Sequence, residues 1–85
     1  MIIVYTSKFQ REYKKLPVAV RLKMEKIEPV FRSNPFHPMF ETHKLYGRLK
    51  EFWSFSIAAK YRVIFQLVGK NTAHFHSVGN HDIYQ

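Results

Sequence analysis

In the second half of the chain we single out four side chains as candidates for breaking an RNA backbone without a metal: His43, Arg62, His81 and Tyr84. In such a reaction the ribose 2′-OH attacks the adjacent phosphate, so a base, an acid and a cation are needed. Histidine titrates near neutrality and can take or give the proton. Arginine offers a planar, permanently charged group that matches phosphate oxygens, and tyrosine can stack on a nucleobase. These residue types indicate RNA cleavage as the candidate chemistry.

Basic residues surround these four. The chain has 14 Lys and Arg residues against 6 Asp and Glu, which gives a formal net charge of +8. On so small a protein this excess creates a strong positive field, which suits nucleic acid, an acidic membrane or an acidic protein. Charge alone does not choose among these partners. If the partner is RNA, the cations expected to contact its backbone are Lys44, Arg48, Lys50 and Lys60.

A metal site is the alternative use for the histidines. His74 and His76 are two residues apart and would share one face of a strand, and imidazoles can bind zinc. However, the sequence has no cysteine, few carboxylates and no H-x-x-x-H pair on a helix. We therefore expect no metal or other cofactor, and we interpret these two histidines as ordinary strand residues. The absence of cysteine also excludes disulfides.

The N-terminal sequence predicts no export signal. Its short apolar run is followed by charges, which is the wrong order for a secretory signal. No apolar stretch approaches the roughly 20 residues that a membrane-spanning helix needs. We expect a cytoplasmic protein.

The candidate residues must be positioned by strands, because the second half of the chain alternates with a period of two. In residues 61–67 the odd positions are apolar, which places Arg62 and Gln66 on the opposite face. Residues 51–58 and 72–78 show similar patterns, and residues 42–46 could form one more strand that ends at Gly47. The face that carries Arg62 is expected to be concave and polar.

The first half predicts one strand and two helices that cover the other face. Residues 2–5 are β-branched and aromatic, as in a strand. Thr6 and Ser7 can then cap a helix whose apolar positions are Phe9, Tyr13 and Leu16. Pro17 suits the first turn of a second helix, which carries one apolar stripe of Val20, Met24, Ile27 and Phe31.

Pro29 conflicts with that second helix, because a proline inside a helix removes a hydrogen bond and clashes with the carbonyl four residues earlier. We expect a kink near residues 25–28, or an early end followed by a looser turn. The whole pattern is β-α-α-β-β-β-β. It predicts an α+β fold in which a helical hairpin packs on a twisted, mainly antiparallel sheet of four to five strands.

Several short motifs occur in a recognisable order: F-x-x-x-Y-K-K-L-P at 9–17, N-P at 34–35, H-K-L-x-G at 43–47, F-W-S at 52–54, Y-R-V-I-F at 61–65 and G-N-H-D-I-Y at 79–84. Together they resemble the RelE/ParE toxin superfamily over essentially the whole chain, as one RelE-like domain of residues 1–85. The ending is most similar to the YafQ-like and YoeB-like branches. The resemblance implies a ribosome-dependent endoribonuclease that cuts mRNA and inhibits translation, and that a cognate antitoxin neutralises.

Position by position, the resemblance implies a role for each of the four residues. Arg62 would contact the scissile phosphate, His81 would transfer a proton, and Tyr84 would stack on the substrate or support catalysis. His43 would be the general base, with Glu41 and Glu51 as alternatives.

The chain also departs from the YafQ-like pattern. Ser56 and Lys60 occupy positions at which YafQ-like members have further catalytic His and Asp residues. Two other functions therefore stay open. One is a ParE-like inhibitor of DNA gyrase that has no nuclease activity, and the other is an RNA-binding module without catalysis. The His and Tyr residues that accompany Arg62 favour the nuclease.

Overall fold

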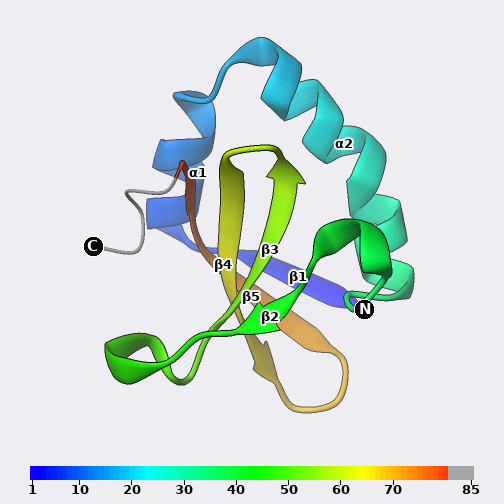
Figure 1. Cartoon of the computed structure of the whole chain (residues 1–85), viewed down its shortest axis with the longest axis vertical. Helices are drawn as coiled ribbons and strands as arrows, with labels where there is room; N and C mark the ends of the chain where they lie inside the picture. The colour runs from blue at the N-terminus through cyan, green and yellow to red at the C-terminus, as the bar shows by residue number, and fades with distance from the viewer. Residues whose placement is uncertain (81–85) are drawn as a thin grey trace.

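The computed structural model describes residues 1–80. One strand, two helices and four further strands follow one another, which confirms the predicted order (Figure 1). The elements are β1 (Ile2–Tyr5), α1 (Ser7–Lys14), α2 (Val18–Ser33), the 3-10 turn η1 (Pro38–Phe40), β2 (His43–Lys44), the 3-10 turn η2 (Gly47–Leu49), β3 (Trp53–Ala58), β4 (Tyr61–Val68) and β5 (Thr72–Gly79). In this part of the chain, no helix is long and apolar enough to cross a membrane.

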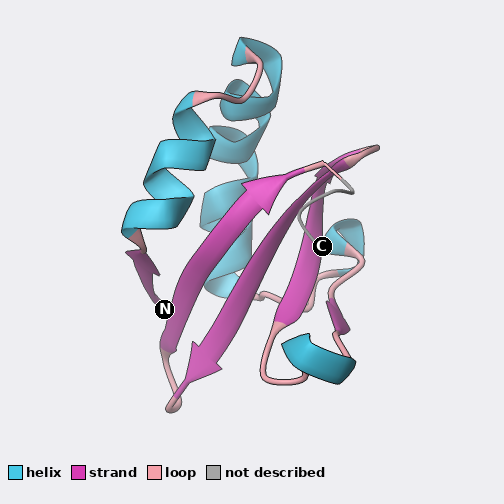
Figure 2. Cartoon of the chain, turned by 90° about the vertical axis from the view of Figure 1, so that its left-hand side faces the viewer, coloured by secondary structure: helices cyan, strands magenta, loops and turns pink. Residues whose placement is uncertain are grey.

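The five strands form one mixed sheet in the order β1-β5-β4-β3-β2. β1 pairs in parallel with β5, with Ile2 opposite Thr72, and the other three pairings are antiparallel. Both helices lie on the same side of the sheet (Figure 2). α1 packs over β5 and α2 over β3, so the two helices diverge from the joint between them (Figure 1). The sheet therefore has a helix-covered face and an open face.

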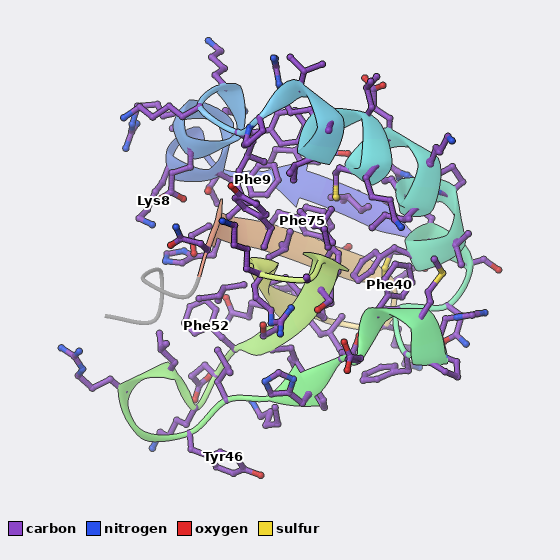
Figure 3. All side chains as sticks on the ribbon, turned by 45° about the horizontal axis from the view of Figure 1, so that its top comes forward. Lys8, Phe9, Phe40, Tyr46, Phe52 and Phe75 are labelled. Carbon is purple, nitrogen blue, oxygen red and sulfur yellow. The ribbon has the colours of Figure 1, made fainter. Side chains whose placement is uncertain are left out.

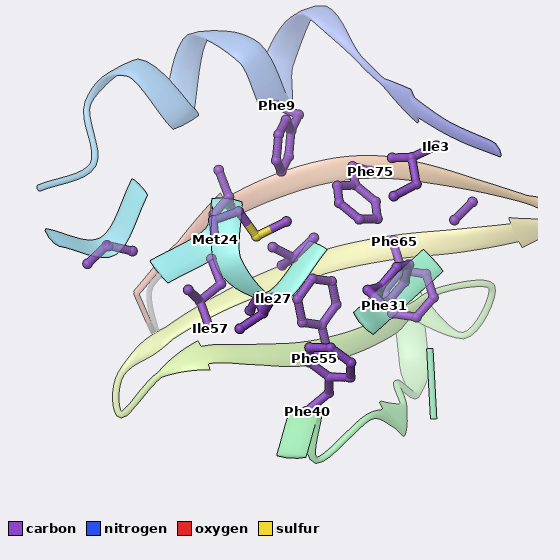
Figure 4. Packing of buried hydrophobic residues seen from close by; sticks show 14 of the residues in the cluster. Ile3, Phe9, Met24, Ile27, Phe31, Phe40, Phe55, Ile57, Phe65 and Phe75 are labelled. Atoms are coloured by element: carbon purple, nitrogen blue, oxygen red, sulfur yellow. The ribbon is translucent and has the colours of Figure 1, made fainter. Parts of the chain in front are cut away.

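The core lies between the helices and the covered face (Figure 4). The predicted stripe of α2 is buried throughout, from Val20 to Phe31. The Phe31 ring is fully buried, and its centroid lies 4.7 Å from that of Phe55 and 5.2 Å from that of Phe65. Such aromatic pairs add about 0.5–1.5 kcal/mol each beyond their buried area. Aromatic packing therefore fixes α2 to the middle of the sheet.

Thr6 begins α1 as predicted, because its Oγ1 accepts a hydrogen bond from the Phe9 backbone N–H at 3.1 Å. A second contact ties α1 to the end of β5. The Glu12 carboxylate accepts from the Val78 backbone N–H at 3.1 Å and also forms an ion pair with Lys8. The start of the chain is thus joined to the strand that leads into residues 79 and 80.

Two predictions about α2 need correction. Pro17 is the N-cap residue and lies just before the helix instead of in its first turn. An early end near Pro29 is wrong, because α2 continues through Pro29 to Ser33. Pro29 is exposed, so the carbonyl that it leaves without a partner can be hydrated. Burial of Ile27 and Phe31 on either side outweighs the roughly 3 kcal/mol that an internal proline costs.

The strand expected over residues 42–46 is also shorter than predicted. β2 contains only His43 and Lys44. Leu45 is buried next to it, whereas Tyr46 is 84% exposed and points away from the body of the protein (Figure 3). Gly47, with φ of +67°, then turns the chain into η2. Backbone turns on both sides therefore limit this edge strand.

Candidate active site

Arg62 lies on the open face of β4, as the alternation of that strand predicts. Its neighbours Val63 and Phe65 have no exposed surface and belong to the core on the other face. In the sheet, Arg62 lies opposite Ser56 on β3 and opposite Gly79 on β5. The guanidinium Nη1 donates a hydrogen bond to the Ser56 hydroxyl. The half-buried arginine on β4 thus has an uncharged hydrogen-bond partner on the neighbouring strand β3.

No carboxylate within residues 1–80 forms an ion pair with Arg62. The one ion pair in this part of the chain joins Lys8 to Glu12, both on α1. A guanidinium is a planar cation that offers five N–H donors and no acceptor. Because its contact in the described chain is a hydroxyl, the positive charge suits an anion that comes from outside, such as a phosphate.

His43 lies on the same face as Arg62. It is opposite Ser54 on β3, two residues before Ser56, which is opposite Arg62. The His43 and Arg62 backbones are separated by two strand spacings and two residues along the strand, or about 12 Å. His43 is exposed. A substrate on the open face would therefore be accessible to both side chains.

The contact that His43 makes fixes its tautomer. Its Nδ1 lies 3.0 Å from the backbone carbonyl oxygen of Glu41. A carbonyl can only accept a hydrogen bond, so Nδ1 must carry the hydrogen and the lone pair of the neutral ring is on Nε2. This is the form that can remove a proton from a hydroxyl group.

Glu41 contacts His43 directly and Arg62 through Ser56. Its carboxylate Oε1 accepts a hydrogen bond of 3.4 Å from the Ser56 hydroxyl, which in turn accepts from Arg62. Its backbone has φ of 49° and ψ of 40°, and it is the non-glycine residue with positive φ in the described chain. This left-handed conformation costs an ordinary L-residue roughly 1–2 kcal/mol. Strained residues of this kind cluster at functional sites.

Other parts of the open face are less polar than predicted. Ile64 lies between Ser54 and Ser77 in one row across three strands, and all three side chains are buried. Next to this row, the ring centroids of Phe52 and His76 are 5.0 Å apart. His76 is thus partly buried against an aromatic ring. Residues 1–80 contain no group of three or more His, Cys, Asp or Glu side chains that could hold a metal ion.

The structure separates Lys44 from Arg62. Lys44 is opposite Trp53, and its ammonium lies 5.4 Å from the centre of the Trp53 ring, on the face away from His43. It also donates a hydrogen bond to the Lys50 carbonyl. Trp53 packs against the core, so the Lys44 side chain lies on the helix-covered side of the sheet.

The other three cations that the sequence predicts to contact RNA lie at the two ends of β3. Lys60 is exposed in the turn between β3 and β4, near the Arg62 end. Arg48 and Lys50 are exposed in the loop before β3, at the opposite end. Glu51, an alternative general base, belongs to that same distant loop, whereas Glu41 reaches Ser56 directly.

His81 and Tyr84 lie outside the described residues, so their predicted roles stay predictions. The strand that leads to them is described, and it places Gly79 directly opposite Arg62. Sequence reasoning noted Ser56 only as a departure from a family pattern, although pairing of residues 56 and 62 around the turn at 59–60 could have identified its contact. No sequence signal indicates the left-handed backbone at Glu41, because glutamate is not typical of that conformation.

No protein-family model matches the sequence, and no curated protein matches it. Solved structures do match. A YoeB/ParE toxin from Agrobacterium tumefaciens superposes with a TM-score of 0.79 at 19% identity, covering 95% of this chain and 99% of that one. YafQ from E. coli gives a TM-score of 0.79 at 17% identity, with 96% and 94% covered.

A further match is to the toxin–antitoxin complex RelBE2 from Mycobacterium tuberculosis, with a TM-score of 0.77 at 16% identity and with 93% of this chain and 95% of that chain covered. The fold is that of the RelE/ParE toxins. The predicted RelE-like fold, a helical hairpin on a mainly antiparallel sheet of four to five strands, is therefore confirmed, and the sheet has five strands with one parallel pairing. At these identities the likeness shows the fold alone, so the activity must be argued from the residues of this chain.

Proposed function

We propose that this protein is the toxin of a type II toxin–antitoxin pair and cleaves mRNA on the ribosome without a metal. The observation that carries the proposal is the placement of Arg62. Its guanidinium lies on the open face, on the same side as His43, and has no carboxylate partner within residues 1–80. A nuclease that acts through a 2′-OH needs a cation and a base arranged in this way.

In the proposed reaction, Nε2 of His43 removes the proton from the ribose 2′-OH. The 2′ oxygen then forms a bond to phosphorus, and Arg62 stabilises the negative charge that develops on the phosphate oxygens. The bond from phosphorus to the 5′ oxygen breaks, which leaves a 2′,3′-cyclic phosphate. The leaving 5′ oxygen receives a proton from His81, the acid that the sequence predicts, while Tyr84 stacks on the substrate.

The cations around the sheet would contact the RNA backbone at a distance from the scissile bond. Lys60 is at the Arg62 end of β3, and Arg48 and Lys50 are in the loop at its other end. Such contacts contribute affinity that falls with increasing salt concentration. An antitoxin is the second proposed partner, because the fold occurs in toxin–antitoxin complexes such as RelBE2 and DinJ–YafQ. A net charge of +8 also favours an acidic partner.

The test is translation of a reporter mRNA with the purified protein, followed by mapping of new 5′ ends. We expect cleavage within the translated region only when ribosomes are present, and we expect the new 5′ ends to carry a hydroxyl group, as attack by the 2′-OH requires. A matched control is Lys70→Ala, which removes one exposed positive charge from the turn between β4 and β5.

The same preparation should be assayed for inhibition of DNA gyrase supercoiling. Inhibition of gyrase by a protein that produces no mRNA ends would replace the nuclease with the ParE-like function. If a folded preparation, shown by a cooperative unfolding transition, has neither activity, the remaining function is RNA binding without catalysis.

A further inference from the structure

Glu41 makes contacts that its position on the surface does not require. Its backbone is left-handed, a conformation that glycine and asparagine adopt more readily than glutamate. The Glu41 N–H donates to the Pro38 carbonyl at 3.2 Å and closes the turn of η1, and this closure needs no carboxylate. A glutamate at this position therefore points to a task for its side chain.

The left-handed turn directs two acceptors of Glu41 toward the candidate site. The backbone carbonyl accepts from Nδ1 of His43 at 3.0 Å, and the carboxylate accepts from the Ser56 hydroxyl at 3.4 Å. Both partners are on the sheet, on neighbouring strands β2 and β3. One strained residue thus contacts the candidate base directly and the candidate cation through one hydroxyl.

Ser56 joins Arg62 to Glu41 by two hydrogen bonds, one accepted and one donated. Its hydroxyl has one hydrogen, which it gives to Glu41, and its oxygen accepts from Nη1 of Arg62. A carboxylate in direct contact with Arg62 would neutralise the guanidinium and compete with a phosphate. With serine between them, the guanidinium is oriented while it keeps its charge for the substrate.

We propose that Glu41 is a positioning residue that holds Arg62, through Ser56, in the orientation that receives the scissile phosphate, and sets the tautomer of His43 through its carbonyl. This inference rests on the proposed nuclease function and names a residue that acts within it. Small displacements of a catalytic group lower rates strongly, by about a hundredfold for 1 Å. Loss of the Glu41 carboxylate should therefore lower kcat more than it raises KM.

Three variants separate positioning from other roles. Glu41→Asn accepts the left-handed backbone readily but is too short to reach Ser56. We expect its unfolding midpoint to equal or exceed that of the wild type, while kcat falls about tenfold or more. Glu41→Gln keeps an oxygen acceptor at the original reach, and we expect it to retain most of the wild-type kcat. Ser56→Ala should match Glu41→Asn in kcat.

The double variant Glu41→Asn/Ser56→Ala should be no slower than either single variant, because both substitutions break the same chain of contacts. Additive losses would overturn the proposal. So would a Glu41→Gln variant as inactive as Glu41→Asn, because that result would make the carboxylate itself a base. An activity loss in Glu41→Asn that parallels a loss of stability would likewise reduce Glu41 to a structural role.

A second measurement keeps this test independent of catalysis. In NMR spectra, the guanidinium N–H signals of Arg62 should be distinct in the wild type and in Glu41→Gln, and averaged by rotation in Glu41→Asn and Ser56→Ala. If the wild type cleaves no mRNA but the signals behave in this way, the proposed function fails while the positioning of Arg62 holds. Identical Arg62 signals in all four proteins would refute the positioning role, whether or not mRNA is cleaved.

Discussion

The two faces of the sheet are organised by different forces. On the covered face, phenylalanine rings from α2 and three strands interlock, and Phe31 alone lies within 5.3 Å of three other ring centroids. On the open face, Arg62, Ser56 and Glu41 are placed by strand register and by single hydrogen bonds. Burial is non-directional and strong in sum, whereas each hydrogen bond contributes little to stability. The covered face should thus govern folding, and the open face should govern activity.

The largest expected effect is on the covered face. Phe31→Ala should reduce the free energy of unfolding by about 3–5 kcal/mol, because it empties a fully buried position beside Phe55, Phe65 and Phe75. Urea unfolding followed by circular dichroism would measure this loss. As a control on the same helix, Leu22→Ala removes an exposed side chain and should change stability little. Equal losses in the two variants would contradict the location of the core.

On the open face, Arg62→Ala should lower the mRNA cleavage rate about 10²–10³-fold, the usual cost of one group that stabilises developing negative charge. Its free energy of unfolding should stay close to that of the wild type. Arg62→Lys keeps the charge without the planar fork and should recover only part of the rate. The proposal for Arg62 fails if Arg62→Ala and Lys70→Ala cleave at equal rates.

Next in size is the effect of removing the candidate base. Glutamine at position 43 can still donate to the Glu41 carbonyl but cannot accept a proton, so His43→Gln should lower the cleavage rate by about 10² or more. Stability should again be unaffected. Single-turnover cleavage at several pH values would show whether the rate also loses its dependence on a basic group. An unchanged rate and pH profile would remove His43 from the mechanism and return Glu41 as the alternative base.

The smallest effect concerns the contact between β1 and α2. Burial, followed by the hydrogen bond to Glu28, raises the pKa of Tyr5 to about 12. A pKa that is higher in the folded state means that this contribution to stability is complete below about pH 10, the pKa of tyrosine in an unfolded chain. It is lost as the pH rises through about 12.

Tyr5→Phe removes this titration. Between pH 10 and 12, the free energy of unfolding of the wild type should therefore fall more steeply than that of Tyr5→Phe, while lysine titration affects both proteins alike. Urea unfolding at pH 9, 10 and 11 measures the difference. Parallel pH curves for the two proteins would show that the Tyr5 hydroxyl titrates alike in both states.

The sequence predicted the structure correctly where the spacing of apolar residues alone determines which side of a helix or strand is buried. The apolar positions of α2 and the alternation of β4 follow from the geometry of a helix and a strand, and they correctly placed Phe31 in the core and Arg62 on the open face. Of the two outcomes predicted for Pro29, the early end of the helix is wrong, because a local rule cannot weigh the tertiary burial of Phe31 against the cost of a proline.

The candidate site was harder to predict because it depends on pairing. His43 and Lys44 are adjacent, and only their register with Ser54 and Trp53 decides which of them shares a face with Arg62. The link through Ser56 and Glu41 needs both this register and a left-handed residue that its type does not suggest. His81 and Tyr84 lie outside the described residues and remain predictions from the sequence.

The parallel pairing of β1 with β5 also sets a time order on folding. Ile2 is opposite Thr72, so the first strand meets its neighbour in the sheet of residues 1–80 after 70 further residues have been synthesised. At about 5–20 residues per second, this interval is roughly 4–14 s. During it, β1 has no strand to pair with, and Arg62 lacks the strand that carries Gly79. A newly made copy therefore cannot complete the sheet around Arg62 until its β5 has been translated.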